Sequence, residues 1–503
     1  MSTSVELFQD SCPGSVAQLL QKEREDITRK DLLDLADRCS VEMVNFRFVA
    51  ADGRLKSLNF AVSDRKRLDR ILGAGERVDG SSLFPFVDPG SSDLYVVPRF
   101  RTAFFNPFAA HRTLDVLCSF FNFKGEPLSH GPDQLVRSAD DALFERTGFR
   151  MESLAELEYY MIAPPTPLYP TEQQRGYGEA PPFSRTEPIR TAAMMLLTRM
   201  GYRVKYGHSE VGRVMDRSSE MEQCEIEFDL APVEDSADAV VVARWVLRML
   251  AARAGVTVTF APKLVQGHAG SGLHVHSRLV RDGKDAIADE SGINETGKRL
   301  LAGYLSLAPS LTAFGNTIPT SYLRLVPNQE APVHVCWGER NRSVLIRVPL
   351  SWSGAGDMTA KANPKAVDAQ VKAISNCTLE LRSPDGSADI HQLHAGMCVA
   401  ALHGLTVPGA VEYADSLRVE SNIFKPEAEQ RRSQLPKLPS SCQASAAALL
   451  EHRKHYEEHG VFSPQVIDKT ASRLMAFGEE EARCRAAGFE EINDLIARYL
   501  HCQ

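Results

Sequence analysis

The sequence has no C-x-x-C pair, no long basic run and no long uninterrupted apolar stretch. Its ten cysteines are scattered along 503 residues, which argues against a zinc ribbon and fits reduced thiols in the cytoplasm. With a formal net charge of -8 and dispersed Lys and Arg residues, the surface would repel nucleic-acid phosphates. We therefore expect no nucleic-acid partner, and we expect any phosphate chemistry to be local and metal-assisted.

The apolar stretches are too interrupted for a membrane span. The longest runs from Ala239 to Ala252 and contains Arg244 and Arg248, so it predicts an amphipathic or buried helix. The N-terminus has no basic segment followed by an apolar run, which a secretory signal would need. We expect a cytoplasmic protein that makes no contact with membranes.

What the sequence does contain is an ordinary globular balance of 43% hydrophobic and 24% charged residues. A chain of this length exceeds the usual single-domain size, so we expect a small domain attached to a large one. β-rich runs around an Asp52-Gly53 turn predict a small, mainly β domain over residues 30–125. Helical periodicity from Asp133 onward, then alternating strands and long helices, predicts an α+β or α/β body over residues 130–503 with a helical C-terminal region.

Two carboxylates, Glu156 and Glu158, are separated by one residue, so on a strand both project from the same face. A solvated strand face is the simpler interpretation of this pair. The neighbouring Leu154, Leu157 and Met161 instead indicate a strand inside the domain. Paired carboxylates in that position need a cation.

A glycine-rich turn, Gly270-Ser271-Gly272, leads into a second pair of this kind, His274 and His276. The glycines would let backbone amides approach a substrate or a phosphate closely. A purely structural histidine pair is an equally good interpretation of this motif alone. Glu210 and Glu225, on two further strand-like segments, are weak candidates by themselves, because most such glutamates lie on the surface.

Arginines dominate the segment that follows; they are Arg324, Arg340, Arg342, Arg347 and Arg382. Guanidinium groups bind carboxylates and phosphates bidentately, so they suit an anionic substrate and a transferring phosphoryl group. Some of them could simply neutralise structural carboxylates. Oxygen ligands with one imidazole favour Mg or Mn over zinc, and two such ions would clamp nucleotide phosphates during phosphoryl transfer.

In their order along the chain, these motifs resemble the glutamine synthetase family. The resemblance runs from Val78 to Arg382 and rests on Asp-Gly-Ser-Ser, Glu-x-Glu, Gly-Ser-Gly-x-His-x-His, Arg-Leu-Val-Pro-x-x-Glu and Asn-Arg-Ser. It implies an α+β chain in which a small N-terminal β-grasp domain precedes a large catalytic domain, whose curved antiparallel sheet is flanked by helices. It also implies a homo-oligomer, a dodecamer of two hexameric rings with active sites between neighbouring subunits.

The resemblance further implies a metal site and two substrate sites. One Mg or Mn ion would be held by Glu158, Glu210 and Glu225. The other would be held by Glu156, His274 and Glu380. The substrate glutamate would contact Gly270, Arg324 and Arg382. The ATP phosphates would contact His276, Arg342 and Arg347.

Three of the implied residues would act in the reaction itself: Asp79, Glu330 and Arg342. Asp79 and Ser82 of the adjacent subunit would bind ammonium, which Asp79 would deprotonate. Glu330 would also contact the substrate, and its segment would close over the site and shield the reactive intermediate from water. The implied reaction transfers the γ-phosphoryl group of ATP to the glutamate side chain, after which ammonia attacks the acyl phosphate to give glutamine.

Some positions depart from the family pattern and keep two alternatives open. Ala269 stands where bacterial glutamine-forming members commonly carry Asn, and this form resembles the branch that joins glutamate to a polyamine, a monoamine or an aniline. Thr378 stands where an ATP-contacting arginine is common, so a catalytically silent, ring-forming member is the third hypothesis. Phe424 lies where some bacterial members carry an adenylylated tyrosine, so that modification is not expected here.

Overall fold

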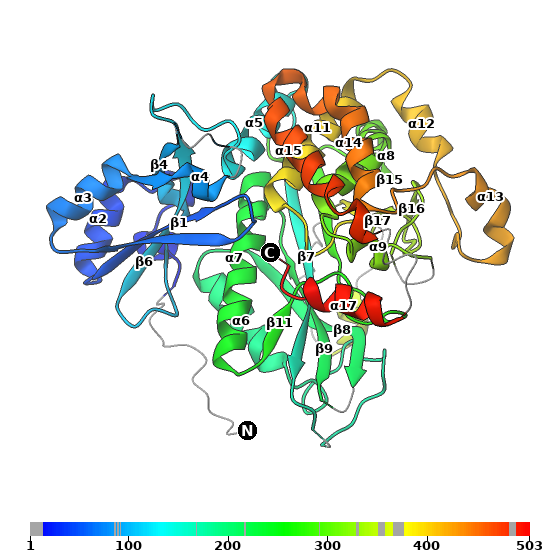
Figure 1. Ribbon diagram of the computed structural model, residues 1–503, viewed down its shortest axis with the longest axis horizontal. Helices are drawn as coiled ribbons and strands as arrows, with labels where there is room; N and C mark the ends of the chain where they lie inside the picture. Colours follow the sequence, from blue (N-terminus) through cyan, green and yellow to red (C-terminus); the bar gives the residue numbers. More distant parts are fainter. Residues whose placement is uncertain are drawn as a thin grey trace.

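A computed structural model describes residues 14–84, 87, 90, 92–166, 168–215, 218–290, 292–327, 331–350, 358–365, 377–481 and 489–502. Two separate sheets organise these residues, one of six strands and one of ten, beside a small two-stranded sheet. Each of the two large sheets has its own hydrophobic core. Figure 1 shows the N-terminal part, in blue, beside the larger body that the rest of the chain forms.

The N-terminal sheet has the strand order β2-β1-β6-β4-β3, with β5 paired to β6. Its strands are β1 Met43–Val49, β2 Leu55–Ala61, β3 Glu76–Asp79, β4 Asp93–Pro98, β5 Phe104–Phe105 and β6 Thr113–Phe121. β1 and β6 pair in parallel, and the other pairs are antiparallel. The expected turn joins β1 to β2, where Gly53 has a φ of 73° that favours glycine.

Helices cover this sheet, so the expectation of a mainly β domain was too narrow. They are α1 Val16–Leu20, α2 Arg29–Arg38, α3 Arg65–Ala74 and α4 Gly80–Leu83, with short 3-10 turns at Arg24–Asp26 and Phe100–Thr102. Leu32 and Leu35 of α2 and Leu68 of α3 share one core with Phe46 of β1 and Val96 of β4. Thr28 caps α2 through a capping box with Asp31, which fixes where that helix begins.

The large sheet has the order β16-β17-β18-β12-β7-β9-β8, and β10, β11 and β13 join it at β7 and β12. Its central strands are β7 Arg150–Ala163, β8 Val204–Met215, β9 Glu220–Phe228 and β12 Leu273–Arg281. The shorter ones are β10 Ala231–Pro232, β11 Thr257–Thr259, β13 Lys284–Asp285, β16 Trp337–Glu339, β17 Ile346–Val348 and β18 Leu379–Leu381. Only β16 and β17 pair in parallel among these described strands. β14 Ala288–Asp289 and β15 Gly292–Ile293 form the small sheet.

Long helices pack around the large sheet, which confirms the α+β expectation. They are α5 Pro132–Thr147, α6 Glu187–Arg199, α7 Val233–Arg253, α8 Glu295–Gly315, α11 Ile390–Thr406, α14 Cys442–Glu457, α15 Pro464–Met475 and α17 Phe489–Arg498. Shorter ones are α9 Ser321–Arg324, α10 Met358–Ala362, α12 Ala410–Ser416 and α13 Glu429–Gln434, with 3-10 turns at Pro426–Ala428 and Glu458–Gly460. In Figure 1 the C-terminal helices α14 and α15 lie next to α8 and α11.

The longest apolar stretch of the sequence lies in α7, and the structure shows which of its two predicted forms is correct. α7 is buried along most of its length, Arg244 included. Arg244 Nη2 donates to the carbonyl oxygen of Gly386 at 3.0 Å, and Arg248 Nη2 donates to that of Cys502 at 3.2 Å. Within the described residues no single helix is long and apolar enough to cross a membrane, and only α11 with α12, bent by 110°, passes that test as a pair.

A buried ionic cluster joins the N-terminal domain to α7. Arg99 Nη1 lies 2.6 Å from Glu234 Oε1 and 2.8 Å from Asp238 Oδ2, and Arg101 Nη2 lies 2.9 Å from Glu234 Oε1. Burial alone would raise the pKa of Asp238, but Arg99 holds that pKa below its usual range. The cluster therefore fixes how the two parts of the chain sit against each other.

Candidate metal centre

The strand register of the large sheet brings acidic and imidazole side chains together on one face. Across the β7/β12 pair, Glu156 is directly opposite His274. Across β7/β9, Glu158 is opposite Glu225, and across β12/β18, His276 is opposite Glu380. Residues directly opposite on antiparallel strands have Cβ atoms about 4.5–5.5 Å apart. The predicted same-face pairs on β7 and β12 are thereby confirmed as strand geometry.

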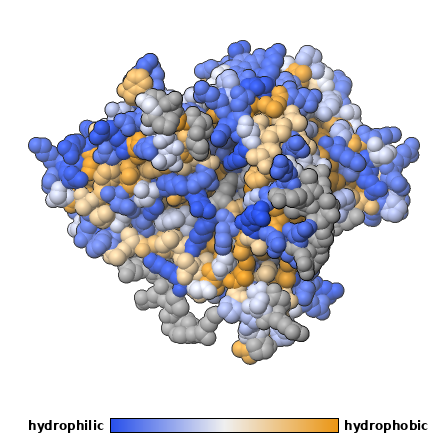
Figure 2. All heavy atoms as spheres, viewed as in Figure 1, coloured by the Kyte–Doolittle hydropathy of each residue, from blue (hydrophilic) through white to orange (hydrophobic). Residues whose placement is uncertain are grey.

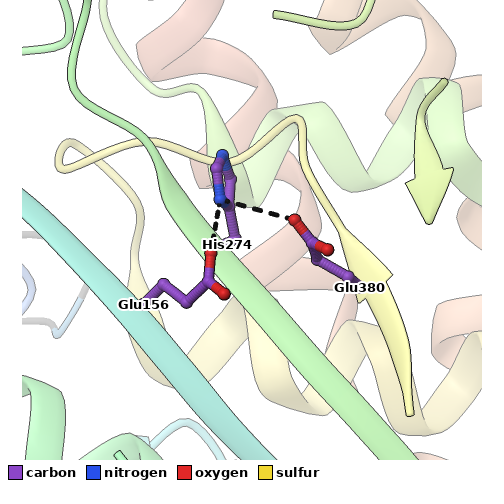
Figure 3. Close-up of side chains that lie close together, drawn as sticks. All are labelled: Glu156, His274 and Glu380. Atoms are coloured by element: carbon purple, nitrogen blue, oxygen red, sulfur yellow. Dashed lines mark hydrogen bonds and ion pairs between the residues drawn. The ribbon is translucent and has the colours of Figure 1, made fainter. Parts of the chain in front are cut away.

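Glu156, His274 and Glu380 form one half of this acidic cup (Figure 3). His274 Nδ1 lies 2.8 Å from Glu156 Oε2 and 3.6 Å from Glu380 Oε1. His276 approaches the same carboxylate, with Nε2 at 3.0 Å from Glu156 Oε1. Glu380 is fully buried. The donor atoms of Glu156, His274 and Glu380 lie within 4.8 Å of one another, so these three residues could hold a metal ion.

The other half of the cup contains Glu158, Glu210 and Glu225. His274 reaches toward this half as well, with Nε2 at 3.8 Å from Glu158 Oε1. Glu158, Glu225 and His274 form a second group that could hold an ion. Glu210 belongs to a third group, together with Glu225 and His208.

Sequence reasoning missed two residues of the cup, His208 and Glu227. His208 Nε2 lies 3.2 Å from Glu225 Oε1 and its Nδ1 lies 3.9 Å from Glu210 Oε1. Glu227 groups with Glu156 and Glu225, and Lys205 Nζ is 2.5 Å from its Oε1. The available signal was strand alternation, because positions 208 and 210, like 225 and 227, face the same side of a strand.

Electrostatic repulsion is concentrated at Glu225. Burial and the nearby carboxylates of Glu156, Glu158 and Glu210 raise its pKa well above the usual range, despite a hydrogen bond from His208. For Glu156 the balance is opposite: burial would raise its pKa, but His276 and His274 lower it well below the usual range. His274 and His276 thus compensate the negative charge of Glu156. The carboxylates around Glu225 keep an excess of negative charge.

The donor set fits one or two hard divalent cations. Oε2 of Glu227 is buried and accepts no hydrogen bond from the described residues, although buried polar atoms normally have such a partner. Carboxylate oxygens with one or two imidazoles suit Mg or Mn, since zinc would recruit more His or Cys. A cation at this place would satisfy the Glu227 oxygen and offset the repulsion.

Replacing Glu225 by glutamine should separate repulsion from metal binding. Without metal, the variant should be more stable than the wild type by about 1 kcal/mol, because one repelling charge is removed. With free Mn²⁺ at 100 times its Kd, the wild type should gain about 2.7 kcal/mol, and the variant clearly less. Urea titrations with EDTA and with Mn²⁺ measure both effects. As a control, Glu295→Gln replaces a carboxylate that is 71% exposed and should change neither the stability without metal nor the stabilisation by Mn²⁺. Equal Mn²⁺ responses in Glu225→Gln and the wild type would exclude Glu225 as a ligand.

Three of the predicted arginines lie at the cup. Arg347 Nη1 is 3.0 Å from Glu380 Oε2, and Arg382 forms a closer ion pair with Glu380 Oε1. Arg324 Nη1 donates to the carbonyl oxygen of Ser383 at 2.8 Å, and its Nη2 lies 3.5 Å from His274 Nε2. Arg342 is exposed and makes no ion pair with a described residue.

The glycine-rich turn packs directly beneath these groups. A Cβ on Gly272 would lie 2.5 Å from Arg324 Nη2 and 2.8 Å from His274 Nε2, and one on Gly270 would lie 2.4 Å from the carbonyl oxygen of Pro262. The Gly272 amide donates to Glu158 Oε2 at 2.7 Å. Gln223 Nε2 bridges that oxygen and the carbonyl oxygen of Gly270, at 3.1 Å each. Only glycine allows this close approach of backbone to the cup.

The residues that depart from the family pattern have defined local contacts. Thr378 Oγ1 is 3.0 Å from His276 Nδ1, so it orients the ring whose Nε2 meets Glu156. The half-buried Ala269 is fixed through its backbone, since Tyr160 OH donates to the Ala269 carbonyl oxygen at 3.0 Å and the Ala269 amide donates to Gln174 Oε1 at 2.7 Å.

Asp79 and Ser82 lie at the start of α4, in the N-terminal domain, and both are exposed. Ser82 Oγ donates to Asp79 Oδ2 at 2.6 Å and Ser81 Oγ to Asp79 Oδ1 at 2.7 Å. These hydrogen bonds lower the pKa of Asp79 to about 2. The contacts of Asp79 in the described part of the chain are with these two serines and none is with the cup. Glu330 lies outside the described residues.

Comparison with known proteins gives a consistent assignment. Residues 40–123 match the family model of the glutamine synthetase β-grasp domain, and residues 132–472 match that of the glutamine synthetase catalytic domain. The first sheet is therefore the expected β-grasp domain, followed by the catalytic domain.

Individual relatives agree with the family models. Glutamine synthetase of Mycobacterium tuberculosis (strain CDC 1551 / Oshkosh) is 28% identical over 481 residues, which cover 88% of this chain and 93% of that protein. The enzyme of the same name from Clostridium saccharobutylicum is 27% identical and covers 88% and 94%.

Two solved structures share the fold. Plasmodium falciparum glutamine synthetase superimposes with a TM-score of 0.72 at 16% identity, covering 92% of this chain and 98% of that one. A GmaS/ADP complex superimposes with a TM-score of 0.70 at 19% identity, covering 91% and 97%. Since the catalytic-domain model alone matches more than half of the residues, this chain belongs to the glutamine synthetase family.

Proposed function

We propose that this chain is an ATP-dependent ligase that phosphorylates the side-chain carboxylate of glutamate and amidates it with ammonia to give glutamine. The observation that carries the proposal is the convergence of Glu156, Glu158, Glu225, His274 and Glu380 on one face of the sheet. Such an oxygen-rich cup suits metal-assisted phosphoryl transfer. The family relationship supports ligase chemistry, and the relatives at 27–28% identity carry the name glutamine synthetase.

The six predicted ligands would divide into two sets. Glu158, Glu210 and Glu225 would hold one Mg or Mn ion, and Glu156, His274 and Glu380 the other, with His208 and Glu227 close enough to orient them. When bound, the two ions would neutralise phosphate oxygens and the charge that develops as the phosphoryl group moves. His274 Nδ1 lies 2.8 Å from Glu156 and 3.6 Å from Glu380, closer than the 3.8 Å that separates its Nε2 from Glu158, which supports this division.

The positive groups around the cup would bind the two anionic substrates. Gly270, Arg324 and Arg382 would meet the glutamate, and His276, Arg342 and Arg347 the ATP phosphates. Arg347 and Arg382 both already face a buried carboxylate, that of Glu380, so their guanidinium groups point where an anion would sit. Arg342 would additionally stabilise the transferring phosphoryl group, a role that suits an exposed guanidinium able to reach in when substrate binds.

A neighbouring subunit would complete the site. Asp79 and Ser82 of that subunit would bind ammonium, and a carboxylate with a pKa of about 2 is fully ionised and attracts a cation. Asp79 would accept the ammonium proton when its serine hydrogen bonds are exchanged for the substrate. Glu330 would contact the substrate and close the site against water.

Exposed apolar side chains support the assembly that this arrangement needs. Phe123 is 70% exposed, Leu168 66% and Leu350 75% in the single chain. In the space-filling view, hydrophobic patches interrupt the hydrophilic surface on the visible face (Figure 2). Contiguous apolar patches, when they are large, mark contact surfaces. We propose a homo-oligomer, a dodecamer of two hexameric rings.

A γ-glutamyl ligase for another amine is the second candidate. It is favoured by Ala269, which presents a methyl group where an amide side chain is common and whose backbone is fixed by Tyr160 and Gln174. The vacated space would suit a larger amine, such as a polyamine, a monoamine or an aniline. A catalytically silent ring is disfavoured, because all six predicted ligands belong to groups that could hold a metal ion.

An amine panel tests these proposals. Purified protein with glutamate, ATP and saturating Mn²⁺ or Mg²⁺ should release phosphate and form a γ-glutamyl product detectable by mass spectrometry. If ammonium gives the highest kcat/KM, the leading proposal holds. If putrescine, ethanolamine, a small alkylamine or aniline exceeds ammonium by tenfold or more, the second candidate replaces it. No product with any amine would contradict both.

A further inference from the structure

A hollow of about 470 Å³, lined by none of the cup residues, lies between the chain that follows α9 and the segment around α13. In Figure 1, α13 is at the outer edge of the molecule. Its walls include apolar side chains and three basic ones, namely Leu325, Phe424, Leu438, His334, Arg432 and Lys437. No acidic residue lines it among the described residues.

The backbone brings two of the basic side chains together. His334 and Lys437 form an isolated antiparallel bridge, supported by hydrogen bonds from the Val335 amide to the Pro436 carbonyl oxygen at 2.8 Å and from the Leu438 amide to the Val333 carbonyl oxygen at 3.1 Å. Residues opposite each other in such a bridge place their side chains on the same side, about 5 Å apart at Cβ. The imidazole and the ammonium group therefore share one wall of the hollow.

Among the described residues, no carboxylate pairs with the basic side chains of the hollow. Neither Arg432 nor Lys437 forms an ion pair with any residue that the structure describes, and Arg432 Nη1 donates only to the carbonyl oxygen of Ile423, at 3.1 Å. Burial, together with Lys437 and Arg432, lowers the pKa of His334. The side chains of His334, Arg432 and Lys437 therefore lie close enough to interact electrostatically within the same hollow.

His334 adds an unsatisfied polar atom to this space. The residue is 6% exposed, and its buried Nδ1 has no hydrogen-bond partner in the described part of the chain. Buried polar atoms are normally paired. An imidazole nitrogen without a partner among the described residues, beside the half-buried Arg432 and the exposed Lys437, offers a donor to a ligand in the hollow.

We propose that this hollow binds a small anion that carries a phosphate or carboxylate group. Lys437, Arg432 and His334 would bind the anionic group through charge-assisted hydrogen bonds, and Leu325, Phe424 and Leu438 would contact the apolar remainder of the ligand. The site is independent of the proposed ligase activity. It lies, however, directly after Arg324, one of the proposed glutamate-binding residues.

Anomalous diffraction from crystals soaked in selenate tests the site without using activity. A selenium peak is expected in the hollow, within hydrogen-bond distance of Lys437 Nζ. The same soak of Lys437→Gln crystals should lose that peak, whereas Lys425→Gln, at an exposed lysine on the same segment, should keep it. The absence of a peak in wild-type crystals would overturn the proposal.

A solution measurement separates a binding site from an adventitious ion. Isothermal titration of the metal-free protein with sulfate should show a site that weakens at least about tenfold in Lys437→Gln, since one charge-assisted contact is removed. Arg432→Gln should weaken it as well, and Lys425→Gln should not. If both variants bind sulfate as the wild type does, any crystal peak is an adventitious ion only and the proposal fails.

Discussion

Replacing Glu156 by glutamine should reduce ATP-dependent amide formation by about a thousandfold or more, about 4 kcal/mol of lost transition-state stabilisation. Glu156 is the residue on which the two imidazoles meet, with His274 Nδ1 at 2.8 Å and His276 Nε2 at 3.0 Å. The amide keeps the shape but loses the charge and half of the acceptor capacity. Product formation at saturating Mn²⁺ and the number of bound ions per chain measure the effect; one ion should be lost.

The matched control is Glu152→Gln, on the same face of the same strand. Glu152 Oε2 pairs with Arg278 Nη2 at 2.7 Å and belongs to none of the metal-binding groups. Its replacement should leave activity within about twofold, because a partly exposed ion pair contributes little. A Glu156→Gln enzyme with wild-type turnover and both ions bound would remove Glu156 from the proposed ligands.

Replacing Arg99 by methionine should destabilise the fold by about 3–5 kcal/mol, the usual cost of removing one partner from a buried ion pair. Asp238 is 3% exposed, and without Arg99 it would be a buried charge with His391 as its remaining close partner, at 3.4 Å. Urea denaturation at pH 7 measures the difference. The difference should shrink as the pH falls, because the unpaired Asp238 of the variant takes up a proton at a higher pH than the paired one.

The sign of this pH effect follows from the depressed pKa of Asp238. A carboxyl whose folded-state pKa lies below its unfolded value stabilises the fold above that unfolded value, and this stability is lost as the pH falls through the folded-state pKa. Burial raises this pKa, and the charge of Arg99 is the largest single cause that lowers it. Arg150→Met, at an arginine that is 43% exposed and paired with Asp140 and Asp141, should cost less than about 1 kcal/mol. Equal effects of the two substitutions would contradict the role of the buried cluster.

Much of the cup could be predicted from local patterns. Alternation along a strand was enough to place Glu156 beside Glu158, and His274 beside His276, on common faces. The pairing of Glu156 with His274 and of Glu158 with Glu225 could not be predicted in this way, because register is set by tertiary packing and by turns elsewhere in the chain. Only the family resemblance, which rests on the order of the motifs, indicated that the residues of these strands form one site.

Two residues of the cup were not predicted, and strand register is again the reason. His208 and Glu227 looked like ordinary strand residues, and only the β8/β9 and β7/β9 registers bring them to the cup. Glu222 is buried and accepts hydrogen bonds from Ser184 Oγ at 2.5 Å and the Thr186 amide at 3.2 Å, which anchors the start of α6. Its role is structural.

Asp79 and Ser82 lie at the junction of β3 and α4. Their proposed substrate-binding role depends on a surface of a neighbouring subunit. It stays a prediction, as does that of Glu330.

Trapping of the acyl phosphate tests the central claim most directly, because it does not depend on which amine the enzyme prefers. Hydroxylamine is a small nucleophile that would convert a γ-glutamyl phosphate into a γ-glutamyl hydroxamate. With glutamate, ATP and Mn²⁺, we expect hydroxamate and ADP in equal amounts, and neither when glutamate, ATP or the metal is omitted or when Glu156→Gln replaces the wild type. Neither hydroxamate nor phosphate release at saturating metal would contradict a metal-dependent ligase at this site.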